Sequence, residues 1–119
     1  MPRRGEDFAR GYTPALGDVV HLDWAPSRGR EMRGPHYALV LSADVYNVAT
    51  GLVIVSPITS NAGKLSNFEF PVRTGRVDGV VILSEVRSLD YQARNIQYEG
   101  KLPAPDIAEA NRRVRMIFP

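Results

Sequence analysis

Two polar loops carry the side chains of this sequence whose types could do chemistry. The first loop runs into a short apolar stretch, and its chemical groups are Arg28, Arg30, Glu31, Arg33 and His36. The second loop spans residues 57–67 and offers mainly hydroxyl and amide groups, among them Thr59, Ser60, Asn61 and Lys64. Loops that are anchored by rigid strands often carry binding and catalytic residues, so these two loops form the candidate site.

Together, these groups would suit cleavage of an RNA phosphodiester bond without a metal ion. The reaction needs a base to deprotonate the ribose 2′-OH, an acid to protonate the leaving 5′-oxygen, and cations to stabilise the charged phosphorane. Its dependence on the 2′-OH would make it specific to RNA. The same residue types also occur in loops that are only solvated, so residue types alone leave both interpretations open.

Short apolar runs separated by turn residues predict the strands that would position these loops. They cover residues 18–24, 36–42, 52–56, 68–72, 79–83 and 96–98, while residues 84–90 either continue the fifth strand or form a separate one. Residues 43–50 predict a short helical turn or an irregular connection. Six or seven short strands with one terminal helix predict a small β-barrel or half-open barrel.

A single strong helical pattern closes the chain. Pro103 and Pro105 precede it, and Asp106 is the expected cap of its first turn. Its apolar positions fall on one face and predict packing on the sheet: Ile107, Ala110, Val114 and Ile117. The arginines of this helix are expected on its solvated side.

The length, net charge and residue counts of the chain predict one folded domain without a cofactor. Residues 1–16 are interpreted as a flexible N-terminal arm and residues 17–119 as a single domain. The net charge of +2 is too small to argue for a nucleic-acid partner without clustering. There are no cysteines and only two histidines, so thiolate catalysis is excluded and no metal site is expected. No apolar run approaches the roughly 20 residues that span a bilayer, so a cytoplasmic protein without membrane contact is expected.

The order and spacing of several short motifs resemble the MazF/PemK (Kid) family of RNA-cleaving toxins. These motifs are Gly17-Asp18-Val19-Val20, Asp23-x-x-Pro26, Gly29-x-Glu31, Ala38-Leu-Val-Leu-Ser42, Ser56-Pro-Ile-Thr59-Ser60 and Val86-Arg87-Ser88-Leu89-Asp90. The resemblance implies an SH3-like small β-barrel with a C-terminal helix, the MazF/CcdB-like fold. It also implies a homodimer and metal-independent, sequence-specific cleavage of single-stranded RNA. The implied partner is a MazE/PemI-like antitoxin that neutralises the toxin.

The resemblance transfers site residues unevenly. Thr59 matches the family's active-site threonine, and Glu31 matches its loop glutamate. His36 occupies the position at which the family usually has its catalytic arginine. His36 either takes over as general acid or base, with Arg33 or Arg30 supplying charge, or is a strand-start residue without a role. A third reading is that cleavage is lost and only binding remains.

The expected RNA contacts come from both loops and from the region before the sixth strand: Arg28, Arg30, Ser60, Asn61, Lys64, Glu85 and Arg87. Two alternatives to the nuclease stay open. One is a non-catalytic RNA- or protein-binding barrel of the same fold. The other is a CcdB-like gyrase-targeting toxin, but that activity depends on a C-terminal Trp-Gly-Ile, whereas this chain ends Met116-Ile-Phe-Pro119.

Overall fold

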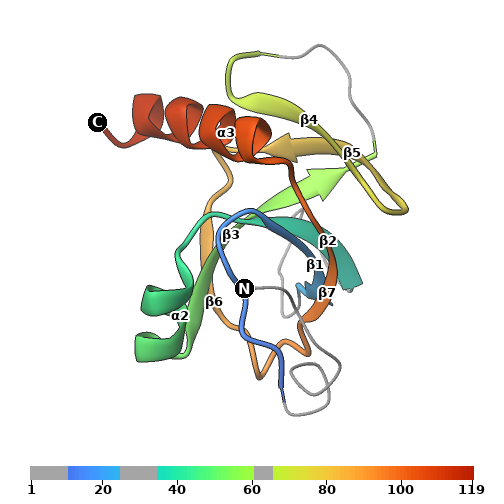
Figure 1. Cartoon of the computed structure of the whole chain (residues 1–119), viewed down its shortest axis with the longest axis vertical. Coiled ribbons are helices and arrows are strands. Elements are labelled where there is room, and N and C mark those ends of the chain that lie inside the picture. Colours follow the sequence, from blue (N-terminus) through green and yellow to red (C-terminus); the bar gives the residue numbers. More distant parts are fainter. Residues whose placement is uncertain (1–10, 25–34, 61–65) are drawn as a thin grey trace, which may run out of the picture.

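The computed structural model describes residues 11–24, 35–60 and 66–119, and these contain seven strands and two helices (Figure 1). In chain order they are β1 (Asp18–Asp23), β2 (Pro35–Val40), α2 (Asp44–Thr50), β3 (Leu52–Thr59), β4 (Glu69–Thr74), β5 (Val77–Ile82), β6 (Arg87–Asp90), β7 (Gln97–Lys101) and α3 (Ala104–Ile117). None of the helices within these residues is long and apolar enough to cross a membrane.

All the strands belong to one curled antiparallel sheet with the order β4-β5-β3-β2-β1-β7. β3 pairs with β2 along one edge. Along its other edge it pairs first with β6, through Leu52–Val55, and then with β5, through Ile58 and Thr59. Figure 1 shows α3 lying along β4 and β5, while α2 lies beside β6 at the opposite end. The predicted mainly β half-barrel with a C-terminal helix on the sheet is confirmed.

The central strands β1, β2 and β3 bury side chains on both of their faces. Because successive side chains point to opposite faces, each strand contributes to two separate apolar clusters. We call the first the barrel core; it contains Tyr12, Val20, Leu22, Trp24, Ala38, Val40, Val53, Val55, Leu89 and Tyr91. We call the second the helix core; it contains Val19, Leu39, Ile58, Phe70, Val72, Val77, Val81, Leu83, Leu102 and Ala110.

α3 covers the helix core with the face that the sequence predicts. Ile107, Val114 and Ile117 pack against this core, and Ala110 is buried within it. The prediction that Asp106 caps the helix is wrong, because the N-cap is Pro103 and makes no side-chain cap bond. The Asp106 amide already donates to the Pro103 carbonyl at 3.0 Å. Asp106 therefore lies in the first helical turn, where its carboxylate still interacts favourably with the positive end of the helix dipole.

Arg113 departs from the prediction that the helix arginines are only solvated. Its guanidinium lies 5.0 Å from the centre of the Phe70 ring, and its side chain is 23% exposed. It also bonds to Glu109 at 2.7 Å. Arg113 therefore joins α3 to β4 through a cation–π contact.

β3 runs to Thr59, three residues beyond the predicted end at Ser56. Pro57 signalled a loop, but it lies inside the strand opposite Ala38. The carbonyl of Ile54 accepts from Leu41 on the β2 side, so the alternation of the strand turns Pro57 toward the other edge. There it falls between the segments of β3 that pair with β6 and with β5. Its missing N–H therefore costs no ladder bond.

Smaller boundary differences affect the last strands. β6 is a separate strand, since a turn in which the Glu85 amide donates to the Ile82 carbonyl at 3.1 Å breaks the chain before Arg87. β7 extends to Lys101 rather than ending at Tyr98.

Buried polar groups attach the segment before β1 to the sheet. Asn47 is fully buried, and its amide nitrogen donates to the Pro14 carbonyl at 2.8 Å and to the Ser42 carbonyl at 3.2 Å. The Ser42 hydroxyl donates to the Asn47 side-chain oxygen at 2.6 Å. Tyr12 lies in the barrel core and donates to the buried carboxylate of Asp18. Residues 11–16 are thus packed on the domain, whereas residues 1–10 of the expected arm lie outside the described residues.

Candidate active site

His36 and Thr59 belong to neighbouring strands, and the register of these strands brings them together. β2 pairs with β3 through Tyr37 opposite Ile58 and Ala38 opposite Pro57. One further step of the same register sets His36 opposite Thr59. Directly opposed residues of an antiparallel pair have Cβ atoms about 4.5–5.5 Å apart, on the same face of the sheet. Both residues are half-buried, and alternation assigns both to the barrel-core face.

Gly79 of β5 lets a third strand approach this pair closely. Thr59 pairs with Val80. A Cβ atom at Gly79 would lie 2.5 Å from the Thr59 carbonyl oxygen and 2.9 Å from a methyl carbon of Ile58. Only a residue without a side chain fits there, so Gly79 fixes how β5 supports Thr59. Gly79 was not among the expected site residues, because its importance depends on a long-range strand pairing.

Arg87 opens β6 and is held in place by an aromatic ring. Its guanidinium carbon lies 5.3 Å from the centre of the Trp24 ring, within the range of a cation–π contact. Trp24 is 3% exposed and lies in the barrel core, directly after β1. Arg87 pairs with Val55 and therefore shares the face of β3 that carries Thr59. A guanidinium is thus fixed on the same face as the imidazole and the hydroxyl.

The strand ends from which the two polar loops depart are adjacent. The first loop enters β2 just before His36, and the second leaves β3 just after Thr59. Ser60 and Glu85 are exposed at the surface, Glu85 in the turn before β6. The remaining predicted site residues lie outside the described residues: Arg28, Arg30, Glu31, Arg33, Asn61 and Lys64.

The other histidine lies on the opposite face of the sheet. His21 pairs with Tyr37, and their rings meet edge to face with centroids 5.1 Å apart. Alternation along β1 and β2 assigns this contact to the helix-core face, away from His36. Within residues 11–24, 35–60 and 66–119, no three His, Cys, Asp or Glu side chains are grouped so that they could hold a metal ion.

Comparisons with known proteins agree with the sequence resemblance. The chain is 28% identical over 107 residues to the endoribonuclease toxin MazF of Escherichia coli K12, covering 90% of this chain and 96% of that protein. It is 33% identical over 106 residues to the E. coli K12 endoribonuclease toxin ChpB, covering 85% and 90%.

Solved structures agree as well. The crystal structure of MazF from Deinococcus radiodurans superposes with a TM-score of 0.81 at 35% identity, covering 91% of this chain and 98% of the other. A MazE-MazF crystal structure from the same organism gives a TM-score of 0.77 at 33% identity, covering 91% and 97%.

A family model described as PemK-like, MazF-like toxin of type II toxin–antitoxin system matches residues 15–118. This range includes both polar loops, the whole sheet and α3. The chain therefore belongs to the family of PemK-like, MazF-like toxins of type II toxin–antitoxin systems.

Proposed function

We propose that this chain is an endoribonuclease toxin that cleaves single-stranded RNA at short sequence motifs without a metal ion. The observation that carries the proposal is the β2–β3 register: Tyr37 lies opposite Ile58, so the next step sets His36 opposite Thr59, where the first polar loop ends and the second begins. Membership of the toxin family and relatives named as endoribonucleases support it.

In this mechanism, His36 transfers the proton and Thr59 binds the phosphate. An imidazole can act as general base or general acid near neutral pH, so His36 can deprotonate the 2′-OH or protonate the leaving 5′-oxygen. Glu31 would take the complementary role. The Thr59 hydroxyl can donate a hydrogen bond to a phosphate oxygen, and Arg33 would neutralise the charge that develops on the phosphorane.

Arg87 is proposed to hold the RNA backbone rather than to react. Its contact with Trp24 limits the positions of the guanidinium before RNA arrives. An arginine restrained in this way loses less side-chain freedom when it grips a phosphate. Arg28, Arg30, Ser60, Asn61, Lys64 and Glu85 are proposed to line the remaining path of the strand.

The proposed partners follow from the family. Solved neighbours include MazE-MazF complexes, which supports a MazE/PemI-like antitoxin as the protein that neutralises this chain. We propose a homodimer whose groove receives the RNA, acting in the cytoplasm, where messenger RNA is available.

The test is cleavage of a long single-stranded RNA by purified, antitoxin-free protein in EDTA, followed by mapping of the new ends. Discrete cuts with 5′-hydroxyl ends are expected. His36→Ala and Thr59→Val should each lower the rate about a hundredfold, the scale at which proton transfer and charge stabilisation contribute. Thr74→Val, the same hydroxyl-to-methyl change at the end of β4, is the matched control and should leave the rate unchanged.

The opposite outcomes are equally informative. Discrete cuts at the wild-type rate in the His36→Ala protein would refute its catalytic role. If a folded wild-type protein leaves the RNA intact, the nuclease proposal is refuted and a barrel that only binds remains. His36 in place of the family's arginine would then explain the lost cleavage.

A further inference from the structure

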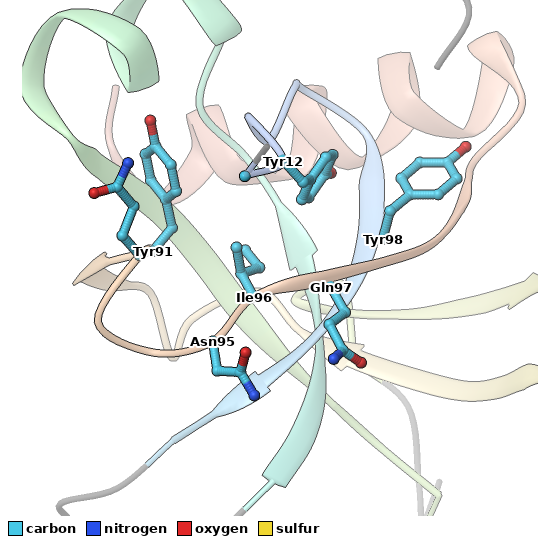
Figure 2. Close-up of a pocket in the computed structure, with 8 residues that line it drawn as sticks. Tyr12, Tyr91, Asn95, Ile96, Gln97 and Tyr98 are labelled. Atoms are coloured by element: carbon cyan, nitrogen blue, oxygen red, sulfur yellow. The ribbon is translucent and has the colours of Figure 1, made fainter. Parts of the chain in front are cut away.

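A pocket with aromatic walls opens beside the barrel core, at the N-terminal segment and the β6–β7 connection (Figure 2). Its volume is about 590 Å³, within the roughly 300–1,000 Å³ usual for small-molecule sites. The proposed function uses none of the residues that line it.

The walls are formed largely before any ligand arrives. Tyr12 and Tyr91 are buried, and their hydroxyls donate to the Asp18 carboxylate and to the Asn47 carbonyl. The rings of Tyr12 and Tyr98 meet edge to face with centroids 5.7 Å apart. Half-buried Ile96 completes the apolar surface. A flat apolar group would therefore meet ring and aliphatic carbon chiefly at half-buried Tyr98 and Ile96, because Tyr12 and Tyr91 are only 5% and 6% exposed.

Three amide side chains are found among the described residues at the rim. Gln92, Asn95 and Gln97 line the pocket and are exposed, with Gln97 on the face of β7 opposite Ile96, and each amide can both donate and accept hydrogen bonds. Within the part of the chain that the structure describes, no arginine, lysine, aspartate or glutamate lines the pocket, so these residues offer no ion-pair partner to a phosphate or a carboxylate. The complementary ligand is a flat, uncharged ring with donors and acceptors on its edge, which describes a nucleobase.

The pocket lies in line with the candidate active site. β1 pairs with β2 through Leu22 opposite His36, and β1 pairs with β7 through His21 opposite Gln97. One further step of the β1–β7 register sets Ile96 opposite Leu22. A single row across the sheet therefore runs from Thr59 through His36 and Leu22 to Ile96.

The length of this row matches a short piece of RNA. Three spacings of about 4.8 Å put Ile96 about 14 Å from Thr59 along the sheet. A stacked strand covers this distance in about four nucleotides at 3.4 Å each, and an extended strand needs fewer. Leu22 and Ile96 belong to the barrel-core face, on which alternation also puts His36 and Thr59.

We propose that this pocket, which we call the tyrosine pocket, binds one base of the substrate RNA two to four nucleotides from the cleaved bond. The inference rests on the proposed nuclease function. It adds a contact that selects the strand by stacking and edge recognition, away from the reacting phosphate.

The test is an abasic scan of the RNA. After the cleavage site is mapped, each nucleotide within five positions of it is replaced in turn by an abasic residue, and initial cleavage rates are measured in EDTA. An abasic residue at one position, two to four nucleotides from the cut, should lower the cleavage rate about tenfold, which is the scale of one lost base–aromatic contact.

The variant that tests the protein side is Gln92→Ala/Asn95→Gly/Gln97→Ala. It removes the three exposed rim amides, and glycine suits the positive φ of 54° at Asn95. This variant should cleave intact RNA more slowly and should lose most of its sensitivity to the abasic position. Asn111→Ala, which removes an amide from α3 on the other side of the sheet, is the matched control and should behave as wild type.

Each result decides the inference. Cleavage at equal rates for every abasic position outside the cleaved dinucleotide would overturn the tyrosine pocket and leave the nuclease standing. If no RNA is cleaved, the nuclease proposal fails, and the same scan by equilibrium binding decides the pocket. One sensitive position supports base binding, whereas uniform binding or no binding overturns it and favours a protein ligand.

Discussion

At the scale of single residues, the position of Thr59 depends on the absence of a side chain in β5. Gly79→Ala would place a methyl group against the Thr59 carbonyl oxygen and a methyl carbon of Ile58. Because backbone cannot rotate away as a side chain can, β5 and the end of β3 should move apart. We expect cleavage to fall at least tenfold, with a stability loss of about 1–3 kcal/mol from overpacking.

The measurement for Gly79 is the cleavage rate per folded protein, together with thermal unfolding. Gly100→Ala is the matched control, since its new methyl group would meet the side chain of Thr74, which can rotate. A folded Gly79→Ala protein with wild-type activity would show that Thr59 does not depend on this contact.

Asn47 is the second residue for which the contacts predict the effect of a substitution. Asn47→Ala removes the side chain that bonds to the Pro14 carbonyl and to both polar groups of Ser42. Buried partners left without hydrogen bonds make this change costly, and we expect a loss of about 3 kcal/mol in the free energy of unfolding. Denaturant unfolding measures it. The exposed Asn67→Ala should change stability by less than about 0.5 kcal/mol, and an equal loss in both variants would contradict the network.

At this scale the sequence indicated the chemistry of the candidate site, and the roles of its residues stay predictions. The motifs around Thr59 and Arg87 marked residues that the structure assigns to one face of the sheet, on β3 and β6. The support beneath them could not be predicted. That Trp24 lies under Arg87 and that Gly79 lies against Thr59 are consequences of strand pairings between distant segments, which local sequence patterns do not encode.

At the scale of elements, α3 carries a pH-dependent contribution to stability. Hydrogen bonds from Arg112 and Arg113 lower the pKa of Glu109 from 4.5 to about 2. Because the pKa is lower in the folded state, this stabilisation is fully present above pH 4.5 and is lost as the pH falls toward 2.

Glu109→Gln tests this contribution. The variant should be less stable than wild type at pH 7, and the gap should narrow between pH 4.5 and pH 2 because the wild-type carboxylate becomes protonated there. Thermal unfolding across this pH range is the measurement. Arg115→Ala, on the same helix but outside these ion pairs, is the control, and its difference in stability from wild type should not follow this titration. A difference between wild type and Glu109→Gln that does not change with pH would contradict the assignment.

The elements themselves were largely predictable, and the errors have local causes. Alternating and apolar runs located the strands and α3, because periodicity reports which face is buried. β3 was predicted too short because Pro57 normally ends a strand, and only the switch from β6 to β5 along that edge removes its cost. Asp106 suits a cap in isolation, but two prolines allow the helix to start before it.

At the scale of the whole molecule, one sheet carries the candidate active site, the tyrosine pocket and the face that α3 covers. The sequence predicted the single barrel because its composition and its evenly spaced strands leave few other arrangements. The tyrosine pocket could not be predicted, since Tyr12 and Tyr98 meet only after the chain has closed β7 onto β1.

The sharing of β1, β2 and β3 between the two cores has a consequence for cooperativity. Neither core can melt alone, because loss of either one removes support from the same three strands. Unfolding should therefore be two-state. Trp24, the only tryptophan, reports the barrel core by its fluorescence, and circular dichroism follows the helices, chiefly α3 on the helix core.

The two unfolding curves should coincide in denaturant. Loss of the helical signal at lower denaturant than the fluorescence change would show instead that α3 and its core form a separate unit. If the curves coincide, a substitution in the helix core will lower the folded population of the candidate active site as much as an equally destabilising substitution in the barrel core.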